Sequence, residues 1–323
     1  MRLQRRRFLF LVAAASVVSS QAMAQNWPTR PVKLVVSAAP GAAPDVIARL
    51  VVEKLGPRIG QPIVVENRPS AGQAVALKTV AFVEPDGYTL LMGNSATLAI
   101  SPALSPELDF SNSKPFVPIG VVATIRNILV ASPKLPANTV SEVVAWSKAN
   151  PGKLNFGASL GSPPQLLGAY FGVKTGANMT YVPYRTNVQA VTDLLAGELQ
   201  LSAEAPPLLL PHILDGKIKA IVVASAQRLP ELPDVPTLSE AGIDGFPLST
   251  WFGINGPAGT PDAIVQKLNA AINDTVNDDA FKSSLAKLGF TAQGGSPRDY
   301  AALIAEDARK WANVIKQTGA RAE

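Results

Sequence analysis

The stretch that most constrains the fold is residues 34–55, which read LVVSAAPGAAPDVIARLVVEKL. A short apolar strand, expected at 32–36, runs into a loop of small residues and prolines. A helix should follow, because apolar side chains then recur at helical spacing, at Val46, Ile47, Leu50, Val51 and Leu55. The free N–H groups and positive dipole end of such a helix form an anion site at the carboxyl end of the strand, where open α/β sheets bind ligands. We therefore expect this loop to hold the acid group of a small molecule.

Strands and helices alternate along the rest of the chain. Further strands are expected at 62–67, 88–92, 154–158, 180–183, 199–203 and 218–224. This alternation predicts parallel sheets with crossover helices. The β-prone run 119–131 and a strand at 251–255 indicate two crossings between lobes. We predict an α/β protein with a two-lobed, clamshell-like fold, each lobe a mostly parallel sheet flanked by helices. Lobe 1 would comprise 25–125 and 251–323, and lobe 2 would comprise 126–250.

The N-terminus has the pattern of an export signal. Basic residues precede an apolar run from Phe8 to Val18, and Ala22-Met23-Ala24 forms an A-x-A cleavage pattern. The run is too short to span a membrane. We expect cleavage after Ala24 and a periplasmic mature protein. The segment from Arg5 to Leu9 resembles the twin-arginine consensus, but a general secretory signal explains the same residues, so the export route stays open.

Composition excludes several classes of function. The net charge of +5 comes largely from residues 1–24, which hold four arginines and no acid, and the remainder carries 25 basic and 24 acidic residues. This balance argues against a nucleic-acid surface. The chain has no cysteine, and its only histidine is His212, so cysteine-based and histidine-clustered metal sites are excluded. We expect no metal and no cofactor. A secreted hydrolase using Ser159 or Ser162 would need His212 as its base, and no G-x-S-x-G surrounds either serine.

A set of segments, all in order, makes a family recognisable. The clearest are WPTRPVKLVV (27–36), GQPIVVENRPSAG (60–72), PDGYTLLMGN (85–94), DLLAGEL (193–199), WFGINGPAGTP (251–261) and KWANVI (310–315). They resemble the Bug-type extracytoplasmic solute-binding receptors of tripartite tricarboxylate transporters, over about 27–319. The resemblance implies a non-enzymatic receptor whose two α/β lobes close on one small ligand, commonly a carboxylate, and deliver it to membrane permease subunits. We expect a monomer. A receptor that presents its closed form to a signalling protein remains an alternative.

The candidate ligand contacts come from loops at strand ends in both lobes. In lobe 1 they are Ala39, Pro40, Gly41, Ala42, Ala43, Asp45, Ser95 and Thr97. In lobe 2 they are Ser159, Gly161, Ser162, Gln165, Thr186, Asn187 and Glu204. Each also has a structural explanation. Asp45 is an acid in a first helical turn, favoured there by the helix dipole, and the serines would serve equally as helix caps.

The ligand loops depart from the pattern usual in the resembled family. The first loop usually reads like PFAPGGGTD, whereas alanines stand here at 38, 42 and 43. Loss of the aromatic residue should widen the site, and the exchange of glycine for alanine disfavours positive φ angles. Pro44 removes an N–H that could meet a carboxylate. In the second lobe the usual His-Leu is Gln165-Leu166. These changes favour an aromatic or bulkier acid and predict weak binding of succinate, while aliphatic, amino and aromatic acids all stay open.

Two charged residues near the expected site have open roles. Glu204 ends an apolar strand where the family usually has Asp. If Glu204 faces the cleft, it would repel a second carboxylate and favour an amine, amide or hydroxyl group on the ligand. If it faces solvent, it has no such role. Arg185 could bind a carboxylate bidentately or could be a solvated surface residue.

Overall fold

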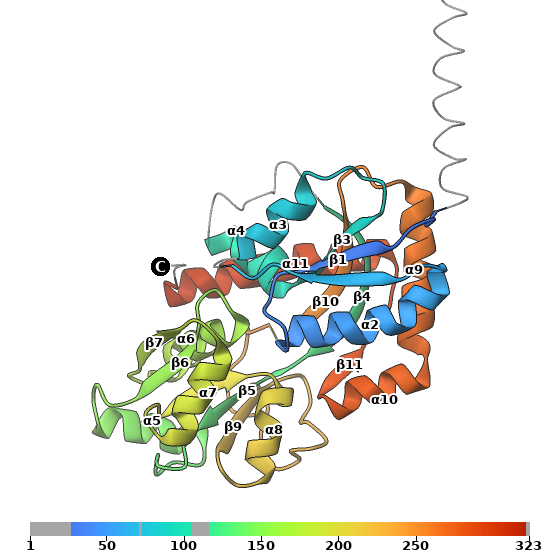
Figure 1. Ribbon diagram of the computed structural model, residues 1–323. Coiled ribbons are helices and arrows are strands. Elements are labelled where there is room, and N and C mark those ends of the chain that lie inside the picture. Colours follow the sequence, from blue (N-terminus) through green and yellow to red (C-terminus); the bar gives the residue numbers. More distant parts are fainter. Residues whose placement is uncertain (1–26, 71–72, 105–115, 248, 321–323) are drawn as a thin grey trace, which may run out of the picture.

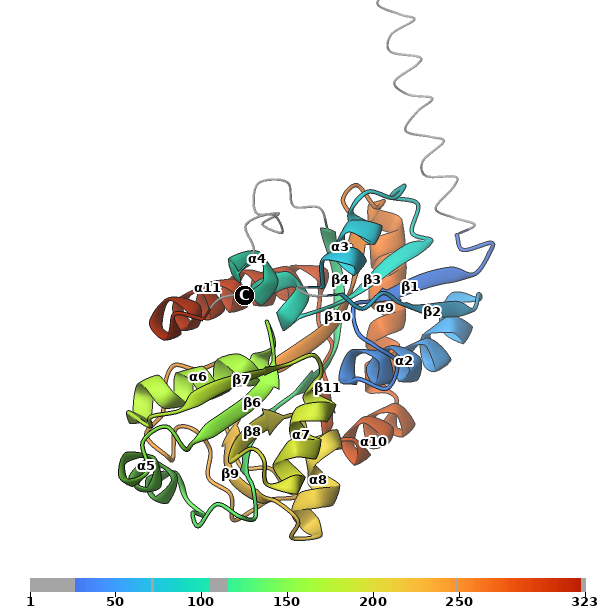
Figure 2. The ribbon, with the colours of Figure 1, turned by 60° about the vertical axis from the view of Figure 1, so that its left-hand side comes forward.

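The computed structural model describes residues 27–70, 73–104, 116–247 and 249–320. The predicted signal peptide and its cleavage motif lie outside these residues. The described chain forms two β-sheets, each flanked by helices, in two lobes (Figures 1 and 2). The predicted two-lobed α/β class is confirmed. No helix among the described residues is long and apolar enough to cross a membrane.

The sheet of lobe 1 has six strands in the order β11-β4-β10-β3-β1-β2. Their bounds are Val32–Val36 (β1), Ile63–Asn67 (β2), Thr89–Asn94 (β3), Phe116–Ile125 (β4), Thr250–Pro257 (β10) and Phe290–Ala292 (β11). The helices of this part of the chain are α2 (Ala43–Ile59), α3 (Ala74–Ala81), the π-helical turn η2 (Ala96–Ile100), α4 (Ser101–Leu104), α9 (Asp262–Asn277), α10 (Asp279–Lys287) and α11 (Pro297–Thr318). Gly60, at φ +86°, ends α2 in the left-handed conformation that glycine adopts without strain.

The sheet of lobe 2 has five strands in the order β7-β6-β8-β5-β9. Their bounds are Asn127–Ala131 (β5), Asn155–Ser159 (β6), Thr180–Tyr184 (β7), Leu201–Glu204 (β8) and Lys219–Ala224 (β9). The helices between them are α5 (Val140–Ala149), α6 (Pro163–Thr175), α7 (Asn187–Ala196) and α8 (Pro206–Leu214). Side-chain oxygens of Thr139, Ser162 and Thr186 cap α5, α6 and α7.

The prediction that each sheet is mostly parallel is wrong, because both sheets are mixed. Among the strands of the described residues, only β1 with β2 and β3, and β6 with β7 and β8, pair with each other in parallel. The reason lies in the crossings. Strand β4 leaves lobe 1 and β10 returns to it, so these neighbours run in opposite directions, with Ile125 opposite Thr250. Strand β5 likewise enters lobe 2 against the direction of β8 and β9. The predicted lobe boundaries lie beside this pair of crossing strands and stay a prediction.

The long C-terminal helix α11 packs against both lobes. In lobe 1, Tyr300 donates a hydrogen bond to Asn255 on β10, with 2.9 Å between their oxygens. Farther along, the helix lies across α6 of lobe 2 (Figure 2), and the ring of Trp311 meets that of Phe246 edge to face at 5.2 Å. The indole N–H groups of Trp251 and Trp311 both donate to one carboxylate oxygen of Asp307, at 2.8 and 2.9 Å. Trp251 is therefore a core residue at the junction of the lobes.

Candidate functional site

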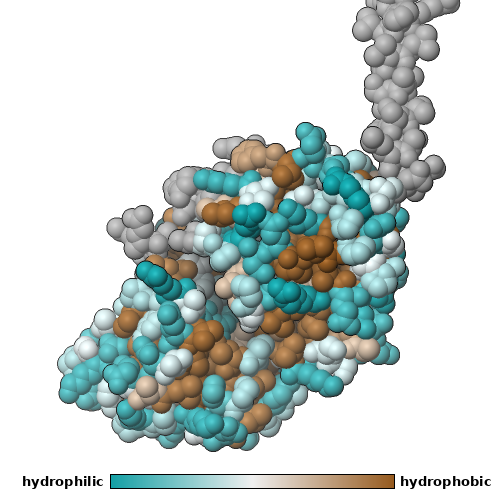
Figure 3. Space-filling model, in the orientation of Figure 1, coloured by the Kyte–Doolittle hydropathy of each residue, from teal (hydrophilic) through white to brown (hydrophobic). Residues whose placement is uncertain are grey.

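The carboxyl ends of the parallel strands from both lobes face the junction where the chain crosses. Strand register shows this, since Val36 lies opposite Asn67 and Met92, while Glu204 lies opposite Ile128, close to the crossing at Arg126. The loops at 37–42, 160–162 and 185–186, which hold several of the candidate ligand contacts, follow β1, β6 and β7 directly. Figure 3 shows the surface hollowed along the junction between the lobes. The fold thus brings loops of both lobes to one place.

Asp45 organises the first loop from inside. Its side chain is only 3% exposed and forms an ion pair with Arg49 at 3.0 Å. It also accepts hydrogen bonds from the N–H of Gly41 at 2.8 Å and from the side-chain amide of Asn67 at 3.0 Å. Burial alone would raise the pKa of Asp45, but Arg49, Gly41 and Asn67 together hold it below its ordinary value. This carboxylate is fully used by the protein, so its role is to position the loop.

Asn67, at the end of β2, is a residue that sequence reasoning missed. Its side-chain amide donates to the carbonyl oxygen of Ala38 at 2.9 Å as well as to Asp45. It therefore ties the first loop to the neighbouring strand. Its position could have indicated this role, because Asn67 is a polar residue at the end of a strand that follows β1 in the chain.

The alanines of the first loop fit its backbone. The φ angle of Ala42 is −73°, and the positive φ of +82° falls on Gly41. The expected strain from exchanging glycine for alanine therefore does not arise at Ala42. Pro44 lies within the first turn of α2 and lacks an N–H, as predicted. The N–H groups of Ala39 and Ala43 make no hydrogen bond to any described residue and remain available as donors.

Ser95 and Thr97 lie inside the protein in this structure. Both are fully buried. The Ser95 hydroxyl accepts the backbone N–H of Trp251 at 3.3 Å and also bonds the carboxylate of Asp307. The Thr97 hydroxyl donates to the carbonyl oxygen of Asn94 at 2.9 Å. The sequence predicts Ser95 and Thr97 in a loop, but β3 continues to Asn94 and η2 begins at Ala96, where the Asn94 side chain accepts the N–H of Thr97. The geometry gives no support to ligand contacts by Ser95 and Thr97.

The second-lobe loop after β6 is held by its own side chains. The N–H of Gly161 donates to Gln165 at 2.7 Å, and the Ser162 hydroxyl donates to the carbonyl oxygen of Ser159 at 2.7 Å. Ser162 also caps α6 by accepting the N–H of Gln165. The N–H of Ser159 donates to the side chain of Asn187 at 2.7 Å. This network joins the starts of α6 and α7.

The four helices that follow the loops differ in the donors that their first turns leave free. Helices α6 and α8 begin with paired prolines, which have no N–H groups (Pro163 and Pro164; Pro206 and Pro207). Helix α7 begins without proline, and the N–H groups of Asn187 and Val188 have no partner among the described residues. Helix α2 offers the single N–H of Ala43. The free donors therefore come from α2 in lobe 1 and α7 in lobe 2.

Glu204 lies between the starts of α7 and α8. One carboxylate oxygen accepts the N–H of Ala205 at 2.8 Å, and the carboxylate also bonds the side chain of Asn187. It forms no ion pair with any described cation. Burial raises the pKa of Glu204 to about 7, although its contacts with Ala205 and Asn187 oppose the rise. Arg185 is exposed and directly precedes Thr186, the N-cap residue of α7.

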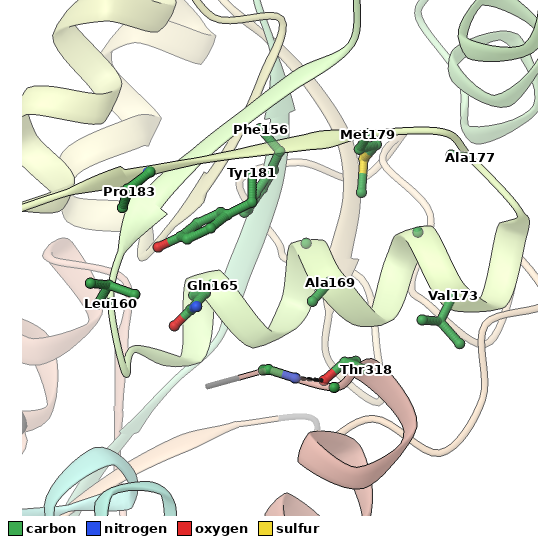
Figure 4. Close-up of a pocket in the computed structure, with 14 residues that line it drawn as sticks. Phe156, Leu160, Gln165, Ala169, Val173, Ala177, Met179, Tyr181, Pro183 and Thr318 are labelled. Atoms are coloured by element: carbon green, nitrogen blue, oxygen red, sulfur yellow. Dashed lines mark hydrogen bonds between the residues drawn. The ribbon is translucent and has the colours of Figure 1, made fainter. Parts of the chain in front are cut away.

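A second hollow begins at the ends of β6 and β7 and runs along α6. It is a groove of about 560 Å³ between α6, β7 and the end of α11, and its lining is mainly apolar (Figure 4). Figure 4 shows Leu160 and Gln165 at one end, Val173 toward the other, and Thr318 across from α6. Gln165 is the one predicted site residue in its lining. This groove is therefore not the predicted carboxylate site.

Two sheets with a crossing strand pair, and ligand loops at facing strand ends, define a two-lobed solute-binding protein. A model of the tripartite tricarboxylate transporter family receptor matches residues 47–320. The chain belongs to this receptor family. Its members and its solved structural relatives are solute-binding receptors, not enzymes, and the family acts outside the cytoplasm.

Relatives align over nearly the whole chain. Protein BugT of Bordetella pertussis is 34% identical over 95% of this chain and 95% of its own length. An R. palustris protein solved with adipate superposes with a TM-score of 0.85 at 32% identity, over 92% of this chain and 99% of its own. MatC from Rhodopseudomonas palustris, solved with bound malate, gives 0.81 at 31% identity, over 90% of this chain and 100% of its own. The predicted resemblance to Bug-type receptors is confirmed.

Proposed function

We propose that this receptor captures a small carboxylic acid between its two lobes in the periplasm and delivers it to the membrane permease of a tripartite transporter. One observation carries the proposal. Backbone N–H groups that have no partner among the described residues lie at the strand ends of both lobes, in Ala39 of the first loop and Ala43 of α2, and in Asn187 and Val188 of α7. Backbone N–H groups at helix starts favour carboxylates, and closure of the lobes would remove water from around them.

The charges beside the free donors suggest that the two lobes bind different groups of the ligand. In lobe 1 the donors lie beside a carboxylate, that of Asp45, which Arg49 neutralises. In lobe 2 they lie beside Glu204, which forms no ion pair with a cation of the described residues. A ligand carboxylate is therefore better accommodated against the first loop. The adipate and malate recorded for two solved relatives support a carboxylate as the common ligand group.

A thermal-shift screen of the purified protein against carboxylic acids and their methyl esters tests capture. A ligand at a hundred times its dissociation constant stabilises a protein by about 2.7 kcal/mol, which moves the midpoint by roughly 2–4 °C per kcal/mol at this size. We expect a shift with a free acid that its ester does not produce. Equal shifts with acid and ester, or no shift in well-folded protein, would contradict carboxylate capture. Uptake of the identified acid into permease-containing vesicles only when the receptor is added would test delivery.

A further inference from the structure

The side chain of Glu204 faces the α7 side of its sheet. Side chains alternate along a strand, and Ala203 packs in the core cluster that includes α6, so Glu204 points the other way. Its carboxylate meets the side chain of Asn187 at the first position of α7. The following residue, Ala205, packs among lobe 1 side chains such as Phe252 and Phe290. Glu204 therefore lies at the junction of the lobes, next to the free donors of α7.

Glu204 and the start of α7 together offer a hydrogen-bond acceptor beside hydrogen-bond donors. The carboxylate of Glu204 offers only acceptor atoms when ionised. The N–H groups of Asn187 and Val188 offer only donors, and the helix start adds a partial positive charge. A ligand carboxylate here would satisfy the N–H groups but would be repelled by Glu204. A ligand ammonium would satisfy Glu204 but would leave the N–H groups unpaired and would face the helix dipole.

We propose that Glu204 and the start of α7 select acids whose far end carries a neutral group that both donates and accepts hydrogen bonds, a hydroxyl or a carboxamide. The inference rests on the proposed function, in which the first loop holds the ligand's carboxylate. The neutral group donates to Glu204 and accepts from Asn187 or Val188, so it pairs the carboxylate and a free N–H group at once, which neither a carboxylate nor an ammonium can do. The high pKa of Glu204 agrees with a carboxyl group that has no cationic partner.

Isothermal titration at pH 8 with acids of matched length tests this selection. The six-carbon set is adipate, its monoamide, 6-hydroxyhexanoate and 6-aminohexanoate, and the four-carbon set has the same end groups. We expect the better of the monoamide and the hydroxy acid to bind at least tenfold more tightly than the dicarboxylate and the amino acid of the same length. In Glu204→Gln the preference over the dicarboxylate should shrink at least tenfold, because the charge is lost while the side-chain shape is kept. Glu204→Asp, which keeps the charge, should retain the preference.

Glu198→Gln provides the matched control, since Glu198 is exposed and precedes β8 at its far end. This variant should leave all affinity ratios unchanged. A wild-type protein that binds the dicarboxylate as tightly as the neutral-ended acids, with the same ratios in Glu204→Gln, would overturn the inference and leave carboxylate capture standing. If no acid of either set or of the thermal-shift panel binds, both the inference and the proposed function fail.

Discussion

At the scale of single residues, two carboxylates near the junction of the lobes are in opposite situations. Asp45 is surrounded by donors and paired with Arg49, so its charge is stabilised. Glu204 has an adjacent N–H and one side-chain amide but no cationic partner among the described residues, so its charged form is destabilised by burial. The contacts of Asp45 stabilise the folded protein. The buried charge of Glu204 destabilises it, and a hydrogen-bond donor on a ligand would reduce that destabilisation. Each situation predicts a different response to substitution.

Asp45→Ala should lower the free energy of unfolding by about 1–3 kcal/mol, because the donors of Gly41, Arg49 and Asn67 lose a charged acceptor. Urea unfolding measures the change. Asp215→Ala is the control, since Asp215 forms an exposed pair with Lys217, and it should cost less than about 1 kcal/mol. Equal losses in the two variants would show that Asp45 does not organise the loop.

Glu204→Gln should change how stability depends on pH. The pKa of Glu204 is about 7 in the folded protein and about 4.5 when unperturbed, so between these values the folded state binds more protons than the unfolded state. The free energy of unfolding therefore falls as pH rises through this window. The variant lacks this fall and should gain on the order of 3 kcal/mol relative to wild type between pH 4 and pH 8. Urea unfolding at several pH values measures it, and a pH-independent difference would refute the assignment.

At the scale of secondary-structure elements, α11 joins parts of the chain that the sequence places far apart. Asp307 on this helix receives the indole N–H groups of Trp251 from β10 and of Trp311 from one turn farther along the helix. It also bonds Ser95 beside β3. Burial raises the pKa of Asp307, and these three donors counteract the rise. One buried carboxyl group thus links α11 to β10 and to the residue that follows β3.

Asp307→Ala should destabilise the protein by about 2–5 kcal/mol, because two buried indole N–H groups lose their acceptor. Glu306→Ala, one residue earlier in α11, removes an exposed pair with Lys310 and should cost less than about 1 kcal/mol. Denaturant unfolding followed by tryptophan fluorescence compares the two. A loss in Asp307→Ala no larger than that in Glu306→Ala would contradict the role of Asp307.

Local signals in the sequence predicted most elements but not how they assemble. Periodicity and caps placed the strands and helices, including Thr139 at the start of α5. The antiparallel pairs escaped prediction because strand direction depends on where the chain crosses between lobes. The burial of Ser95 and Thr97 escaped it as well, since contacts between distant elements determine burial. The absence of N–H groups at the prolines, in contrast, could be predicted from the sequence alone, because it does not depend on the fold.

At the scale of the whole molecule, the lobes share their hydrophobic interior. One core cluster contains Trp251, Tyr300 and Trp311 of lobe 1 together with Phe156 and Tyr170 of lobe 2. Another places Ala205, at the end of β8, among residues of lobe 1. Since neither lobe can lose its packing without exposing side chains of the other, the lobes should not unfold independently.

Calorimetry should therefore show a single unfolding transition, with coincident midpoints for tryptophan fluorescence and far-ultraviolet circular dichroism. Added ligand should raise the midpoint without splitting the transition. Two resolved transitions, or midpoints that differ between the two probes, would show that the shared cluster does not couple the lobes.

The paired prolines that begin α6 and α8 bear on how receptors of this kind can evolve. A proline in the first helical turn has the backbone angle that the helix already needs, so exchanging it for alanine or serine leaves the backbone in place and adds one N–H group. Such an exchange takes one nucleotide change. Pro163 and Pro207 each lie at the start of a helix that faces the junction. A lineage could thus acquire a new anion-binding donor, and a different nutrient, in one mutational step without rebuilding the fold.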